Sequence, residues 1–209
     1  MKKIVIFDMD GTLIDSKKDI TIAVNYVRQK NHNLPPLSEE FVVEAINKKE
    51  RNLAYLFYQT KVYEARDREL FEEFYHQQCI QNPYLYDGIE ELLKRLKEHG
   101  VLMGVATNAP TKFAKRMLSH LKVVDMFEKV VGADISKPKP DPDMILQILQ
   151  ACNYKKDHDR AWMVGDNQKD IDAALRSNIE AIYAMWGFKS EVDWRIKVKE
   201  PKEILKIVL

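Results

Sequence analysis

Short apolar runs alternate with longer segments of helical periodicity along most of the chain. The first run, residues 3–7, is continuous and favours β structure, which predicts a strand buried on both faces. Later apolar runs predict four more strands, separated by helical segments. The strands are expected at 101–106, 129–132, 161–164 and 181–183, and the helices at 88–99, 111–121, 143–152 and 169–177. This alternation predicts a parallel sheet with helices on both faces, an α/β fold.

Residues 18–81 interrupt the alternation. Their apolar positions, such as Ile20 and Val24, recur at a spacing of three or four, which is typical of helices. The Pro35-Pro36 pair breaks the segment, and Ser38 has the sequence pattern of a helix start. The segment is therefore predicted to be an all-helical insertion that follows the first strand.

The charge balance and the cysteines exclude several classes of protein. The 33 Lys and Arg residues nearly balance the 32 Asp and Glu residues, so no broad field favours nucleic acid or an anionic membrane. Cys79 and Cys152 lie far apart, which indicates neither a disulfide framework nor a metal site. The first apolar run is stopped by Asp8 and Asp10, so it is predicted to be neither a signal peptide nor a membrane span. We expect a cytoplasmic protein.

Polar residues follow three of the predicted strands. The first strand ends in Asp8 and Asp10, another in Thr107-Asn108, and another in Asp166. In open parallel sheets, ligands bind beyond the carboxyl ends of the strands. Each polar strand end taken alone could be a simple turn, but three together favour a functional site.

Asp8 and Asp10 have a spacing that suits phosphate chemistry. Residues i and i+2 of an extended chain face the same side, with Cα atoms about 6–7 Å apart. One carboxylate can attack phosphorus while the other reaches the leaving oxygen. Two anions this close repel each other and any phosphate, so a cation is expected nearby. A hard ion such as Mg²⁺ prefers oxygen ligands and fits that role. A calcium-binding EF-hand loop is excluded, because Leu13 stands where the loop needs glycine and a strand precedes it.

Four motifs in order resemble the signatures of the haloacid dehalogenase superfamily. They are Phe-Asp-Met-Asp-Gly-Thr-Leu at 7–13, Thr107-Asn108, Lys-Pro-Lys-Pro-Asp-Pro at 137–142, and Gly165-Asp166 with Asp170. The resemblance spans nearly the whole chain and is strongest to the phosphoglycolate phosphatase-like group. It implies a doubly wound, parallel, five-stranded Rossmann-like sheet in the order 5-4-1-2-3. The core would comprise 1–15 and 83–209, and the helical cap 16–82.

The resemblance also implies how the reaction proceeds. Asp8 would be the nucleophile that forms an aspartyl-phosphate. Asp10 would protonate the leaving oxygen and then activate water. Thr107 would hold the transferring phosphoryl group through its hydroxyl, and Asn108 would help to bind the substrate through its amide.

A lysine and a Mg²⁺ ion would balance the negative charge. Lys137 and Lys139 compete for the lysine role, and the pattern Lys-Pro-x-Pro-Asp favours Lys137. The implied Mg²⁺ ligands are Asp8, the backbone carbonyl of Asp10, and Asp166, supported or joined by Asp170.

The segment 47–51 lies where relatives place a substrate-facing loop of the cap. It carries three cations and one anion, and solvated charges at a helix start are the alternative interpretation. Because Lys137 and the metal already serve the phosphate, Lys48 and above all Arg51 are candidates to bind a second anionic group. We therefore expect a small phosphorylated metabolite with a second negative charge. At the end of the helix that follows Asp170, relatives often have glycine; Asn178 is expected to adopt the same left-handed conformation.

Other activities of the superfamily are less favoured. A phosphosugar mutase carries a histidine early in the cap, where this chain has Ile20, and a dehalogenase lacks the second acidic residue, Asp10. A phosphonate hydrolase needs a specific cap lysine that no spacing singles out. A nucleotidase or pyrophosphatase remains an alternative, as does a catalytically inactive binding protein, although the acidic residues of the motifs are retained. The sequence names neither the substrate, for which phosphoglycolate is the leading candidate, nor the oligomeric state.

Overall fold

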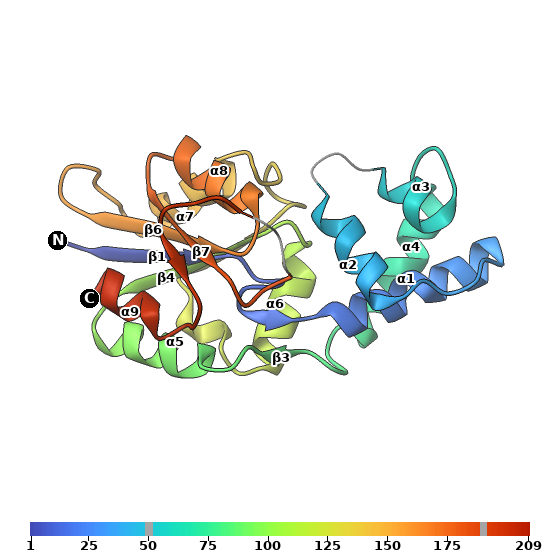
Figure 1. Cartoon of the computed structure of the whole chain (residues 1–209), viewed down its shortest axis with the longest axis horizontal. Helices are drawn as coiled ribbons and strands as arrows, with labels where there is room; N and C mark the ends of the chain where they lie inside the picture. The colour runs from blue at the N-terminus through green and yellow to red at the C-terminus, as the bar shows by residue number, and fades with distance from the viewer. Residues whose placement is uncertain (49–51, 189–191) are drawn as a thin grey trace. The chain divides into compact units, whose positions relative to one another are not determined.

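The computed structural model describes residues 1–48, 52–188 and 192–209, which divide into two compact units (Figure 1). The core unit comprises Met1–Asp15 and Tyr84–Leu209, and the helical unit comprises Ser16–Pro83. The assignment of 16–82 as a cap domain on a core of 1–15 and 83–209 stays a prediction.

The core unit is built on one parallel sheet. Within the described residues the order of its strands is β5-β4-β1-β6-β7-β8. The strands are β1 (Lys3–Phe7), β4 (Leu102–Thr107), β5 (Lys129–Gly132), β6 (Arg160–Gly165), β7 (Glu180–Ala184) and β8 (Lys197–Val198). The five predicted strands, numbered along the chain, follow the order 3-2-1-4-5, which is the expected order read from the opposite edge. The α/β fold with a parallel sheet is therefore confirmed.

The apolar run of β1 occupies the centre of this sheet. Residues 4–7 are fully buried, because β4 and β6 pair with β1 on either side and helices cover both faces. On one face, α7 (Asp143–Ala151) and α8 (Gln168–Arg176) pack on Ile4 and Ile6. Figure 1 shows α5 (Ile89–Glu98) and α9 (Glu203–Val208) on the other face. The remaining core helices are α6 (Thr111–His120) and a short 3₁₀ helix, Val124–Met126.

The C-terminal tail adds structure that the sequence did not predict. β8 pairs with β7 in parallel, so the sheet has a sixth strand in place of the expected five. The indole N–H of Trp194 donates to the carbonyl of Ala181 at 2.7 Å and holds the tail against β7. A further unpredicted pair, β2 (Ile14–Asp15) and β3 (Tyr84–Leu85), is antiparallel and joins the two chain segments of the core unit.

The helical unit contains four helices within its described residues. They are α1 (Lys17–His32), α2 (Glu39–Asn47), α3 (Leu53–Tyr58) and α4 (Ala65–Gln78). The Ser38 hydroxyl accepts from the N–H of Phe41 at 3.2 Å, which confirms the predicted helix start. Val24, Val27 and Phe57 belong to its buried apolar cluster.

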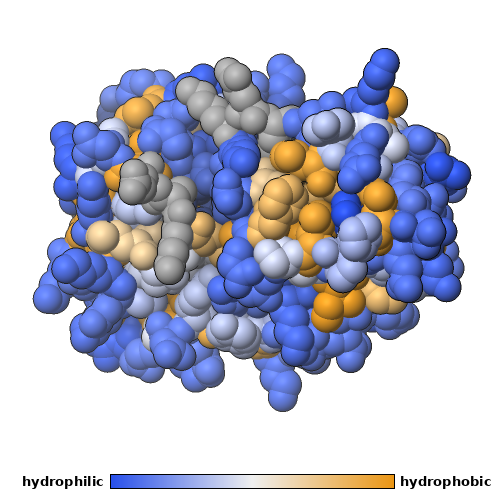
Figure 2. Space-filling model, turned by 45° about the vertical axis from the view of Figure 1, so that its right-hand side comes forward, coloured by the Kyte–Doolittle hydropathy of each residue, from blue (hydrophilic) through white to orange (hydrophobic). Residues whose placement is uncertain are grey.

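Three smaller observations bear on the sequence analysis. Asn178 adopts a left-handed conformation with φ 55°, as expected. Cys79 and Cys152 are both free and buried. Within the described ranges, none of the helices has the length and apolar character needed to cross a membrane. Figure 2 shows a mostly hydrophilic surface on which hydrophobic side chains gather in the right half of the view.

Candidate active site

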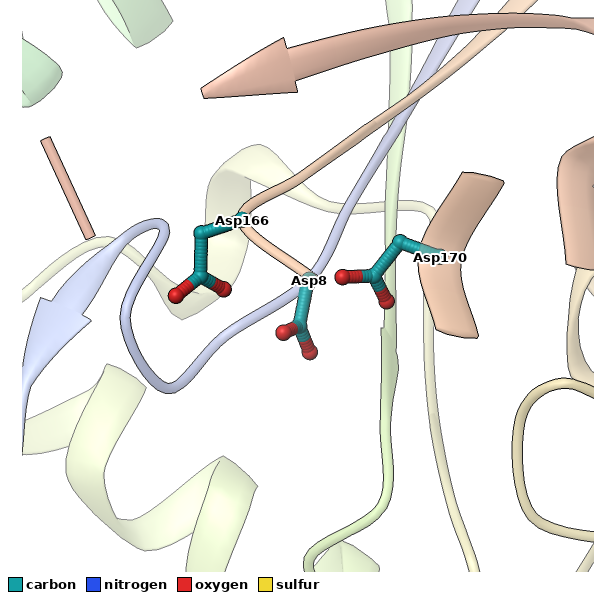
Figure 3. Close-up of side chains that lie close together, drawn as sticks. All are labelled: Asp8, Asp166 and Asp170. Atoms are coloured by element: carbon teal, nitrogen blue, oxygen red, sulfur yellow. The ribbon is translucent and has the colours of Figure 1, made fainter. Parts of the chain in front are cut away.

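Three carboxylates meet at the carboxyl edge of the parallel sheet. Asp8 directly follows β1, Asp166 follows β6, and Asp170 lies in the first turn of α8. Figure 3 shows their side chains turned toward a common space. One oxygen of each carboxylate lies within 4.8 Å of the others, and all three residues are buried. Their position confirms that strand ends distant in sequence converge, and they form a group that could hold a metal ion.

Local hydrogen bonds orient the carboxylates of Asp166 and Asp170. Asp166 accepts from the Thr12 hydroxyl at 3.2 Å and from the backbone N–H of Phe188 at 2.8 Å. Asp170 accepts from the backbone N–H of Asn167 at 3.1 Å, and Asn167 in turn caps α8. Both carboxylates are therefore held in place before any ligand binds.

A buried lysine bridges two of the carboxylates, and it is Lys139. Its Nζ donates to Asp8 Oδ1 at 2.7 Å and to Asp170 Oδ1 at 2.6 Å, and the residue is only 4% exposed. Lys137 is exposed, and its backbone N–H donates to Asp143 at 3.4 Å. The prediction that Lys137 lies against the nucleophile is therefore wrong. The loop turns Lys139 inward and leaves Lys137 in solvent.

The electrostatics of the cluster follow from its burial. Burial, and then the charges of Asp8 and Asp170, raise the pKa of Asp166 above its ordinary value. Burial also raises the pKa of Asp170, although Lys139 opposes the rise. Burial alone would lower the pKa of Lys139, but Asp170 and Asp8 outweigh it and raise that pKa, so Lys139 is a cation. Three carboxylates thus lie close together in a buried site, and the ammonium of Lys139 contacts two of them, Asp8 and Asp170.

Asp10 and Thr107 lie beside this cluster. The Thr107 hydroxyl donates to Asp10 Oδ2 at 3.4 Å and accepts from the backbone N–H of Ala109 at 3.1 Å. Thr107 is the last residue of β4, so the sheet brings it to the loop that follows β1. The side chain of Asp10 is outside the carboxylate group that could hold a metal. The role expected of its backbone carbonyl stays a prediction.

The side chain of Asn108 makes two hydrogen bonds to the loop that carries Lys139. Its Nδ2 donates to the carbonyl of Lys139 at 3.0 Å, and its Oδ1 accepts from the N–H of Lys139 at 2.8 Å. The carboxamide therefore binds the lysine loop. Its predicted contact with substrate stays a prediction.

The candidate residues of the cap are described only in part. Lys48 is exposed and pairs with Glu44 at 3.0 Å, one helical turn away. Arg51 lies outside the described residues, together with Lys49 and Glu50. Their predicted contact with a second anionic group stays a prediction.

The segment after β7 contributes to the site, and the sequence analysis missed it. The indole N–H of Trp186 donates to the carbonyl of Thr12 at 3.0 Å. A Cβ on Gly187 would collide with the carbonyl oxygen of Gly11 and with the side chain of Asp166. Gly11 itself has φ +88°, a conformation that favours glycine. The signal that could have found this segment is its glycine, which follows the last predicted strand of the sheet.

Comparisons with known proteins agree with this geometry. Residues 5–184 match the model of the haloacid dehalogenase-like hydrolases. The chain is 29% identical to the N-acetylmuramic acid 6-phosphate phosphatase of Pseudomonas aeruginosa, over 99% of this chain and 94% of that one. It is 30% identical to the phosphoglycolate phosphatase of Aquifex aeolicus, over 89% and 86% of the two chains.

A solved structure shares the whole fold. It is described as a predicted phosphoglycolate phosphatase from Haemophilus somnus, with a TM-score of 0.84 and 25% identity over 100% of this chain and 98% of that one. The resemblance seen in the motifs is therefore confirmed. Since the family model covers most of its length, the chain belongs to the haloacid dehalogenase-like hydrolase family.

Proposed function

We propose that the protein is a phosphatase that hydrolyses a small organic phosphate monoester through a phosphorylated Asp8. The observation that carries the proposal is the position of the Asp8 carboxylate. It is buried at a strand end, with Oδ1 held 2.7 Å from the Lys139 ammonium and with Asp10 two residues away. Relatives named as phosphatases of this family support the reaction type.

In the first step, an oxygen of Asp8 attacks phosphorus and the bond from phosphorus to the ester oxygen breaks. Lys139 holds Oδ1, so Oδ2 is the oxygen available for attack. Asp10 donates a proton to the leaving oxygen, so the product departs as an alcohol. The Thr107 hydroxyl and the Lys139 ammonium stabilise the charge on the transferring group.

In the second step, Asp10 accepts a proton from water as the water oxygen attacks the phosphorus of the aspartyl-phosphate. The bond from phosphorus to Asp8 breaks, inorganic phosphate leaves, and the carboxylate of Asp8 is regenerated. One difficult displacement is thus divided into two easier ones.

We propose Mg²⁺ as the cofactor, because the residues present fit it. Asp8, Asp166 and Asp170 provide hard oxygen donors within 4.8 Å of one another, and the ammonium of Lys139 contacts two of them. When bound, the ion would neutralise the carboxylates and the phosphoryl oxygens that approach them.

We propose that the substrate carries a second anionic group. Phosphoglycolate and N-acetylmuramic acid 6-phosphate, the substrates in the names of the relatives, each combine a phosphate ester with a carboxylic acid. Phosphoglycolate is the leading candidate. Arg51 and Lys48 are the proposed carboxylate ligands, because a guanidinium can bind a carboxylate through two hydrogen bonds.

Phosphate release in Mg²⁺ tests the function directly. The panel contains phosphoglycolate, N-acetylmuramic acid 6-phosphate, sugar phosphates, nucleoside monophosphates, pyrophosphate and p-nitrophenyl phosphate. We expect release that stops on chelation and returns with Mg²⁺, and a phosphorylated Asp8 in acid-quenched enzyme. Transfer of phosphate between sugar positions without release would indicate a mutase, and an inert protein would indicate a binding role.

Substrate selectivity tests the second anion. Arg51→Ala should raise KM for phosphoglycolate about 10-fold more than KM for p-nitrophenyl phosphate, since only the former loses an ion pair. Equal losses on both substrates, or a preference of the wild type for neutral esters, would contradict this part of the proposal.

A further inference from the structure

The side chain of Asn108 makes two hydrogen bonds to the backbone of one residue. Nδ2 donates to the carbonyl of Lys139 at 3.0 Å, and Oδ1 accepts from its N–H at 2.8 Å. Because one partner is an acceptor and the other a donor, they determine which end of the carboxamide is oxygen. This double contact joins the end of β4 to the loop before α7, 31 residues later in the chain.

The contact lies at the residue of the loop whose ammonium reaches the carboxylates. The side chain of Lys139 is long, and its ammonium lies between Asp8 Oδ1 at 2.7 Å and Asp170 Oδ1 at 2.6 Å. A flexible four-carbon side chain loses conformational entropy when it is held in one position. A fixed backbone lowers this entropic cost, so the two ion pairs have less of it to offset. The loop itself has prolines on both sides of Lys139, which lack the N–H groups that could anchor it.

We propose that Asn108 is a positioning residue, whose carboxamide fixes the backbone at Lys139 and so holds the ammonium group between Asp8 and Asp170. It acts through Lys139 and makes no essential contact with the phosphoryl group. The expected effect of Asn108 on turnover rests on the proposed function. Its expected effect on the position of the Lys139 ammonium does not.

Chemical labelling tests the effect on Lys139 without any assay of activity. Acetylation of the full-length protein by an amine-reactive ester is followed by peptide mapping, with the exposed Lys137 as an internal reference in the same loop. In the wild type, Lys139 should react far more slowly than Lys137. Asn108→Ala should raise the ratio of labelling at Lys139 to that at Lys137 by about 10-fold or more, because the lysine leaves its buried position.

Two further variants make this result specific. Asn108→Asp keeps the acceptor but places an anion against the carbonyl of Lys139, so it should also increase labelling even if Asn108→Ala folds poorly. Ser136→Ala removes a 2.7 Å hydrogen bond to Asp143 in the same loop and should leave the ratio unchanged. An unchanged ratio in both folded Asn108 variants would overturn the proposal, and so would an equal increase in Ser136→Ala.

A double-mutant cycle distinguishes positioning from direct contact with substrate. Asn108→Ala should lower kcat/KM roughly 10- to 100-fold, since a small displacement of a catalytic group costs about this much. In the Lys139→Ala background the same change should cost little. Independent, additive losses would show that Asn108 contacts the reacting group directly, and the positioning role would be wrong. If even the wild type releases no phosphate, the proposed function fails while the labelling result still decides the role of Asn108.

Discussion

Both units of the chain bury charged side chains, but the two sets are balanced in different ways. In the helical unit, Arg28 donates from Nε and Nη2 to the carbonyl of Pro35, at 2.9 and 2.8 Å, and from Nη1 to the carbonyl of Phe57. These contacts tie α1 to the segment before α2 and to α3. In the core unit, three buried carboxylates lie close together, and the ammonium of Lys139 contacts two of them, Asp8 and Asp170.

Asp67, another of the buried charges of the helical unit, also serves packing. Asp67, at the start of α4, accepts from Asn31 at 2.8 Å and lies 2.9 Å from His32 Nε2, so it joins α4 to α1. Both of these partners lie on α1 and contact Oδ1 of Asp67, while its Oδ2 is buried without a hydrogen-bond partner among the described residues. The carboxylates of the core instead cluster around one space, and buried like charges this close together are typical of a site that binds a cation.

The largest expected effect is at Asp8. Asp8→Asn should lower kcat by about 100-fold or more, at least about 2.7 kcal/mol of barrier, because an amide is a poor nucleophile toward phosphorus. Circular dichroism and thermal unfolding check that the variant is folded. Retention of more than about one-hundredth of wild-type kcat would contradict the nucleophile role of Asp8. It would also remove the contrast between catalytic charges in the core unit and packing charges in the helical unit.

The two lysines of the loop provide a matched pair. Lys139→Ala should lower kcat/KM by about 100-fold, because it removes the only cation on the carboxylates among the described residues. Lys137→Ala, two residues away in solvent, should change kcat/KM less than about 2-fold. A larger loss at Lys137 would show that the lysine facing Asp8 is not the one that acts.

Gly187 tests whether the segment after β7 positions Asp166. Gly187→Ala should weaken Mg²⁺ binding roughly 10- to 100-fold, because the added methyl group displaces a carboxylate that the metal needs. The measurement is the Mg²⁺ dependence of Tm, with no substrate present. Gly100→Ala is the control, since a Cβ there meets nothing within 4 Å, so it strains the backbone at φ +67° without touching Asp166. An unchanged Mg²⁺ affinity in Gly187→Ala would contradict the role of this segment.

Arg28 should affect stability and leave the chemistry unchanged. Arg28→Met leaves the carbonyl of the buried Phe57, and that of the exposed Pro35, without their donor. It should lower the free energy of unfolding by about 2 kcal/mol, measured by denaturant unfolding. Arg66→Met, which removes an exposed ion pair with Glu64, should cost less than about 0.5 kcal/mol. A large fall in the kcat of folded Arg28→Met for p-nitrophenyl phosphate would show that the buried charges of the helical unit also serve catalysis.

Much of the fold was predictable because strands buried on both faces leave a clear pattern. The run at 3–7 matches β1, and the run at 129–132 matches β5. The convergence of Asp8 and Asp166 also followed from the sequence, because the carboxyl ends of parallel strands lie at one edge of a sheet. The start of α2 was predictable from Ser38, since a cap is formed by residues close in sequence.

The tail was not predictable in the same way. β8 has only two residues, too few to show a period, and it forms by pairing with Tyr183 and Ala184 of β7. The contacts of Phe188 and Trp186 with Asp166 and Thr12 depend likewise on where β7 ends. The donor of Phe188 is a backbone N–H, which carries no residue-type signal, whereas Trp186 donates from its indole.

The sequence by itself determined that Asp8, Asp10, Thr107 and Asp166 share one edge of the sheet, because strand order and direction place them there. The tertiary structure alone decided which lysine faces Asp8. Lys137 and Lys139 are the same residue type in the same proline-rich loop, and such a loop has no period from which direction can be inferred. Which lysine faces inward depends on two residues that lie 31 positions before and after Lys139. Asn108 binds the backbone of Lys139, and Asp170 binds its ammonium.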